Sequence, residues 1–262
     1  IPFAEPAAFE FTLVDQATPA VSGRDLKLDA SKFLGISEPV RGDIEFTAYL
    51  EGQQVSKASL AVDFTPMQEW LHDASSSQSW QQTLVSLASY STPNRQAVLD
   101  LKQQVHSKLG ESGKSSVSAM QAFLSPEPID IESAKSDVRR EVKALYEVIQ
   151  GWGFSYSNPP AEYTEDSQRI RLAEEIVRDK AATCLDSTLL FTSALEAMGF
   201  SPIIALSPGH AFAGLWIDST GRHIARSWDP ISPVTELQAY LDEGLLLVET
   251  TSMFGNETSF EQ

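Results

Sequence analysis

The sequence has little cysteine and few basic residues, and each shortage excludes a class of protein. Cys184 is the single cysteine among 262 residues, which excludes an internal disulfide framework, a zinc knuckle and an iron–sulfur cluster. The 19 Lys and Arg residues face 36 Asp and Glu residues, so the net charge is −17. Nucleic acids and anionic membranes attract basic surfaces, so we expect neither as a direct partner.

Long hydrophobic runs are also missing, since none approaches the roughly 20 residues that span a bilayer. Apolar residues still make up 42% of the chain, enough to build a core. The chain starts at Ile1 without a basic and apolar leader, and it has one cysteine. We therefore expect a cytoplasmic protein that is a segment of a longer polypeptide.

Hydrophobic patterning divides the chain into three regions and predicts an α+β fold. Alternating residues in 9–14, 43–50 and 59–64 predict strands, so residues 1–66 are expected to form a β-sandwich-like domain. Residues 67–129 are polar with helical spacing and are expected to be a helical connector. Residues 130–262 are expected to form the second domain, in which a central helix packs on an antiparallel sheet.

The second domain begins with an amphipathic helix over 130–150, whose apolar face carries Val138, Val142, Leu145 and Ile149. A short helix is expected near 166–178. A helix that is apolar nearly all round runs from Cys184 to just before Gly199. Strands are expected at 202–207, 210–217 and 222–229, then a helix near 234–242 and a strand at 245–250.

Cys184 and His210 have the arrangement that cysteine nucleophiles require. Backbone N–H groups at a helix start stabilise a thiolate and can donate hydrogen bonds to a developing oxyanion. His210 opens the following strand after the turn Ser207-Pro208-Gly209, where it can serve as the base. Asp186 lies in the first turn of the helix, where a carboxylate is favourably placed near the positive helix end. It could also orient a neighbouring group.

Two carboxylates, those of Asp229 and Glu249, are candidates for orienting His210. The geometry of a turn favours Asp229. A type I turn over Asp218–Gly221 would make paired residue numbers sum to 439, which places Asp229 opposite His210 on one sheet face. A carboxylate there would fix the imidazole tautomer and stabilise the imidazolium. A slip of one residue would move the two side chains to opposite faces.

Several motifs resemble the transglutaminase-like superfamily of papain-type cysteine enzymes. These are Thr183-Cys184-Leu185-Asp186, then Ala194–Pro202, Gly209-His210-Ala211-Phe212 and Trp228-Asp229-Pro230, within residues 135–255. The resemblance implies a Cys–His–acid triad, with Asp229 closing a later strand.

A narrower resemblance points to a different acid. Tyr156–Pro160, Gln168–Arg171 and Leu247–Thr251 are similar to a bacterial subgroup whose transglutaminase-like segment precedes helicase or nuclease regions in very large proteins. Its strand end resembles Val248-Glu249-Thr250-Thr251, which would make Glu249 the acid and the helix near 234–242 an insertion. Asp229 and Glu249 therefore both remain candidates.

Two functions follow from these residues. The first is a cysteine-dependent amide hydrolase or acyltransferase acting on a protein or peptide, with Cys184 as nucleophile and His210 as base. The alternative is a catalytically silent binding or scaffold module of a larger helicase-type protein. We expect no cofactor, since a P-loop ending at Gly113-Lys114-Ser115 would have Lys108 in place of its first glycine. We expect no metal, because His72, His106 and His223 are far apart.

Overall fold

The computed structural model describes residues 6–10, 29–33, 36–72, 77–111, 131–159, 166–217, 223–224, 234–255 and 259–260. Helices and strands are mixed and the sheets are small, which confirms the α+β class. The chain forms two units, Ile1–Glu69 and Trp70–Gln262. No helix in the described part of the chain is long and apolar enough to cross a membrane.

In the first unit, a short helix α1 (Ala30–Phe33) is followed by a ribbon of two antiparallel strands, β1 (Val40–Leu50) and β2 (Gln53–Phe64). The turn at Glu51–Gly52 has positive φ at both residues, 51° and 79°, which matches the twist of a tight hairpin. Of the strand expected at 9–14, residues 11–14 lie outside the described residues. The β-sandwich therefore stays a prediction, and the sheet that the described residues 36–64 form is the two-stranded ribbon.

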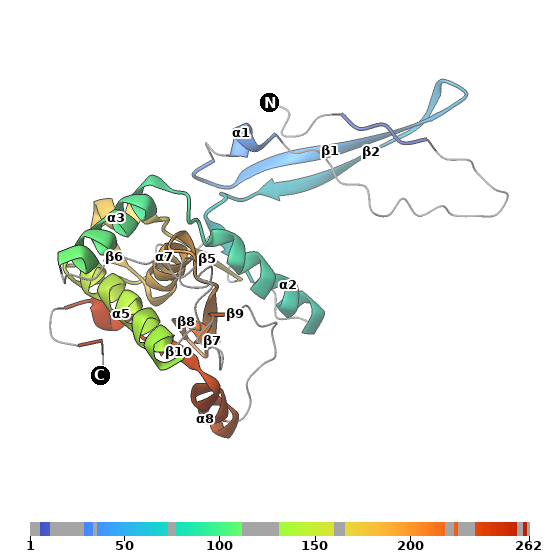
Figure 1. Ribbon diagram of the computed structural model, residues 1–262. Coiled ribbons are helices and arrows are strands. Elements are labelled where there is room, and N and C mark those ends of the chain that lie inside the picture. Colours follow the sequence, from blue (N-terminus) through green and yellow to red (C-terminus); the bar gives the residue numbers. More distant parts are fainter. Residues whose placement is uncertain are drawn as a thin grey trace. The chain divides into compact units, whose positions relative to one another are not determined.

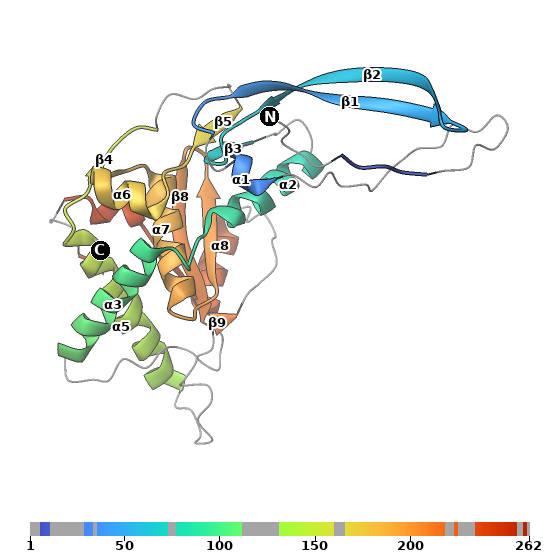
Figure 2. The same ribbon diagram turned by 90° about the horizontal axis from the view of Figure 1, so that it is seen from above.

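The region expected to be a connector belongs largely to the second unit. It contains α2 (Ser77–Leu87), the 3-10 turn η1 (Ala88–Tyr90) and α3 (Gln96–Glu111). Helix α3 buries Val98, Leu101, Val105 and Leu109 in the same core as α5 (Ile131–Gln150). The two helices lie side by side in both views (Figures 1 and 2). This apolar stripe is part of the core of the second unit, which begins at Trp70, and the predicted boundary at residue 130 adjoins residues 112–130, which lie outside the described residues.

The centre of the second unit is α7 (Cys184–Ala197), which starts and ends close to where the sequence predicts. It packs against β7 (Pro202–Ser207) and β8 (His210–Ile217), and Figure 2 shows the helix beside β8. The strand order is β10-β8-β7, with β10 (Leu245–Val248) antiparallel to β8, and β9 (His223–Ile224) also pairs with β8. Helix α8 (Val234–Glu243) leads into β10.

Shorter elements surround the start of α7. Strand β4 (Ser155–Tyr156) runs parallel to β6 (Ala181–Ala182), and β3 (Glu69–Leu71) pairs with β5 (Ser167–Arg169). The helix expected over 166–178 is α6 (Ala173–Asp179), which is shorter because residues 167–169 form a strand. After β10, the 3-10 turn η2 (Thr250–Met253) packs against α5 and α7.

Candidate active site

Cys184 is the first residue of α7, and a reciprocal cap holds this end of the helix. The hydroxyl of Thr183 accepts a hydrogen bond from the Asp186 N–H at 3.0 Å, and the Asp186 carboxylate accepts one from the Thr183 N–H at 2.9 Å. The pattern Thr-x-x-Asp is a sequence signature of such a cap. Since the cap uses the Asp186 N–H, the N–H groups of Cys184 and Leu185 are the remaining donors of the first turn. Cys184 is half-buried, so the residue is not sealed inside the core.

Asp186 is fully buried and anchors the start of α7 to the segment between β5 and α6. Its Oδ1 accepts a hydrogen bond from the Arg171 N–H at 2.8 Å, and its Oδ2 pairs with the Arg171 guanidinium at 2.9 Å. Arg171 is largely buried too, so each charge has its partner out of water. Asp186 therefore does more than favour the positive helix end, because it fixes the backbone on both sides of Cys184.

His210 opens β8, and its partner is Glu249, the residue directly after β10. The His210 Nε2 lies 2.6 Å from the Glu249 Oε2. The other carboxylate oxygen, Oε1, accepts hydrogen bonds from the Thr251 N–H at 2.8 Å and the Thr251 hydroxyl at 2.6 Å. An ionised carboxylate can only accept, so the His210 Nε2 carries the proton and Nδ1 is left as the acceptor in the neutral ring.

The register that favoured Asp229 is wrong. Trp216 pairs with Ile224 and Ile217 pairs with His223, so paired numbers sum to 440 and not 439. The edge of β8 at His210 is occupied by β7, where His210 pairs with Ser207. The turn that set the predicted register, and Asp229 itself, lie outside the described residues. Of the two candidate acids, the structure brings Glu249 to His210.

Packing brings the cysteine end of α7 and the histidine end of β8 into one neighbourhood. Leu185, next to Cys184, and Ala211, next to His210, belong to the same buried cluster, with Leu189 and Ile170. On β8 the ring of Phe212 meets the His210 imidazole edge-on, with 4.7 Å between centroids. Helix α7 and β8 are in direct contact, so Cys184 and His210 belong to adjoining elements.

Tyr156 is a neighbour of Cys184 to which the sequence alone gives no role. It pairs with Ala182 across the β4–β6 ladder, and the next residue donates a hydrogen bond from the Ser157 N–H to the Ala182 carbonyl at 3.0 Å. Burial raises the pKa of the Tyr156 phenol, and the Cys184 sulfur raises it further as a nearby charge and hydrogen-bond acceptor. The Tyr156 side chain, 53% exposed, therefore lies beside the cysteine at the surface.

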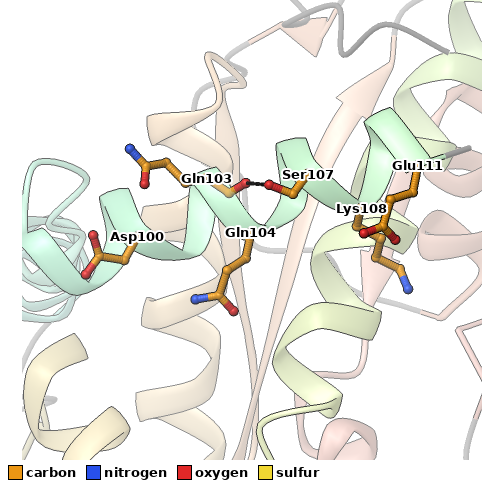
Figure 3. A pocket seen from close by; sticks show the side chains of 6 residues that line it. All are labelled: Asp100, Gln103, Gln104, Ser107, Lys108 and Glu111. Carbon is orange, nitrogen blue, oxygen red and sulfur yellow. Dashed lines mark hydrogen bonds between the residues drawn. The ribbon is translucent and has the colours of Figure 1, made fainter. Parts of the chain in front are cut away.

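A hollow on the outer face of α3 is separate from these residues. Figure 3 shows its lining, which is polar and comes from one helix: Asp100, Gln103, Gln104, Ser107, Lys108 and Glu111. Lys108, which stands where a P-loop would need glycine, is inside this helix and pairs with Glu147 at 2.9 Å. Within the described ranges, no three His, Cys, Asp or Glu side chains are grouped as metal ligands would be.

Comparison with known proteins finds no match. No family model matches the chain, and neither a curated protein nor a solved structure does so.

Proposed function

We propose that the second unit is a cysteine-dependent amide hydrolase or acyltransferase acting on a protein or peptide, as in the transglutaminase-like superfamily. The observation that carries this proposal is the 2.6 Å hydrogen bond between His210 and Glu249 at the edge of the sheet that packs on the Cys184 helix. Cys184 is the nucleophile, His210 the base, and Glu249 the residue that positions the imidazole.

The reaction follows from the tautomer that Glu249 imposes. The His210 Nδ1 takes the proton from the Cys184 thiol, and the thiolate attacks an amide carbonyl. The N–H groups of Cys184 and Leu185 stabilise the oxyanion. The carbon–nitrogen bond breaks, the imidazolium protonates the leaving amine, and a thioester remains on Cys184. Water then releases the acid and regenerates the thiol, or an amine accepts the acyl group. We favour water because it is the more abundant acceptor.

The exposure of the site supports chemistry over a purely structural role. The His210 and Glu249 side chains are 30% and 35% exposed, and Cys184 is half-buried. A structural cysteine is more often sealed in the core. A catalytic site must admit a substrate while keeping its acid–base groups in reach of each other.

Alkylation kinetics test the proposal. Cys184 is the only thiol in the chain, so every thiol adduct forms on its sulfur. We expect iodoacetamide to alkylate the wild-type protein at pH 6 at least about tenfold faster than a free thiol. His210→Ala should remove this advantage, whereas His106→Ala, on α3 and outside the site, should keep it. Equal rates for the wild type and His210→Ala would refute catalysis and favour the binding module.

A further inference from the structure

A chain of buried hydroxyls connects the nucleophile's helix to the turn that carries the acid. The Ser187 hydroxyl donates to the Cys184 carbonyl at 3.0 Å, and Ser187 Oγ lies 2.9 Å from Thr250 Oγ1. Thr250 Oγ1 also lies 3.1 Å from Thr188 Oγ1. The side chains of Ser187, Thr188 and Thr250 are at most 1% exposed, so water does not compete for these bonds.

The donors in this chain can be assigned from proton counting. Each hydroxyl has one proton to donate. Ser187 donates its proton to the Cys184 carbonyl, so it accepts from Thr250. Thr250 has then used its own proton and accepts from Thr188. The bonds run in one direction, from Thr188 through Thr250 and Ser187 to the backbone of the nucleophile.

Thr250 is also the residue between Glu249, which holds His210, and Thr251, which holds Glu249. Through its hydrogen bonds with Ser187 and Thr188, the Thr250 hydroxyl links η2 to the first turns of α7. We propose that Thr250, through Ser187, is a positioning residue that sets the distance between the Cys184 sulfur and the His210–Glu249 pair. This inference rests on the proposed function, because the distance matters only if His210 activates Cys184.

The test is a double-mutant cycle on the rate of iodoacetamide alkylation. In Thr250→Val the methyl group replaces the hydroxyl at similar volume, and we expect alkylation to slow about tenfold, since small displacements in a reactive pair are costly. Adding Thr250→Val to His210→Ala should slow it no further, because the Thr250 hydroxyl acts only through the activation that His210 supplies. Thr250→Ser keeps the hydroxyl and should keep the wild-type rate.

Thr192→Val is the matched control. Thr192 is buried on the same helix, and its hydroxyl donates to the Leu189 carbonyl at 3.2 Å. This variant should be destabilised to a comparable extent and still react at the wild-type rate, so loss of stability alone cannot mimic the effect. If Thr250→Val does not fold, Ser187→Ala replaces it in the cycle, because it breaks the same chain one bond nearer to Cys184.

The outcomes separate this inference from the function it rests on. Equal rates for the wild type and His210→Ala would overturn the proposed function and, with it, the role of Thr250. An enhanced, His210-dependent wild-type rate that Thr250→Val leaves unchanged would overturn the positioning role alone. A slower Thr250→Val whose effect adds fully to that of His210→Ala would also overturn it, since that result indicates a general structural role.

Discussion

The two oxygens of Glu249 have separate partners: Oε2 lies 2.6 Å from His210 Nε2, and Oε1 accepts two hydrogen bonds from Thr251. The residues of the first pair are 39 positions apart in sequence. Thr251 therefore fixes the rotation of the carboxylate, and the carboxylate fixes the imidazole. This arrangement makes the tautomer of His210 a property that mutation can reverse.

Replacing Glu249 by Gln should reverse that tautomer. The amide oxygen will face the two Thr251 donors, so the amide NH₂ will face His210 Nε2 and require it to accept. His210 Nδ1 would then carry the proton and could not take one from Cys184. We expect the alkylation rate at neutral pH to fall at least about tenfold, as it does in His210→Ala, because the imidazole with the wrong tautomer no longer activates the thiol.

The control is Glu174→Gln, which affects an exposed ion pair with Arg95 and should leave the rate unchanged. A Glu249→Gln protein that reacts like the wild type would show that the carboxylate does not determine the tautomer of His210.

Much of the fold could be predicted from the sequence, because period and end signals are local. The apolar faces of α5 and α7 and the glycine at position 199, with φ of 95°, placed those helices to within one residue or two. The choice between Asp229 and Glu249 could not be made, because it depends on strand order and register. A shift of one pair between Trp216 and Ile224 was enough to undo the argument for Asp229.

The role of the hydroxyls was also beyond the sequence. Ser187 and Thr250 are 63 residues apart, and nothing in their local pattern indicates that they meet. The cap at Thr183 and Asp186, by contrast, has a recognisable spacing, and only its link to Arg171 needed the structure.

The buried pair of Asp186 and Arg171 should be a major contributor to the stability of the second unit. Asp186→Asn leaves the guanidinium without its counter-charge and weakens the cap of α7. We expect the free energy of unfolding in urea to fall by about 2–4 kcal/mol. Asp179→Asn removes the partner of the exposed Arg178 and should leave the unfolding midpoint unchanged. Equal midpoints for both variants would mean that the buried pair is not anchoring the helix.

The titration of Tyr156 should report its closeness to Cys184. Burial and the cysteine sulfur together raise the pKa of this phenol above its usual value. Cys184→Ala removes the second contribution, so the pKa should move back down. Difference absorbance of the phenolate against pH measures this, with Tyr156→Phe identifying which transition belongs to Tyr156. An unchanged transition after Cys184→Ala would place the two side chains apart.

Glu141 on α5 should make stability depend on pH. Burial raises its pKa from 4.5 to about 7. Between these values the folded state binds more protons than the unfolded state, so this residue lowers stability as pH rises from 4.5 to 7, with no further change above that range. Glu141→Gln should raise the free energy of unfolding by about 1–2 kcal/mol at pH 8, and this increase should be smaller at pH 5.

Thermal unfolding at the two pH values measures the difference. Glu147→Gln is the control, because Glu147 is also on α5 and pairs near the surface with Lys108 of α3. If Glu141→Gln changes the Tm equally at pH 5 and pH 8, the carboxyl does not titrate with a raised pKa.

Pre-steady-state reaction with p-nitrophenyl acetate tests whether Cys184 accepts an acyl group with the help of His210. We expect a burst of about one nitrophenolate per protein, followed by slower turnover as water attacks the thioester. The burst should be absent in Cys184→Ala and should slow at least about tenfold in His210→Ala. A burst that survives in Cys184→Ala, or that is equally fast with and without His210, would show that Cys184 is not a nucleophile activated by His210.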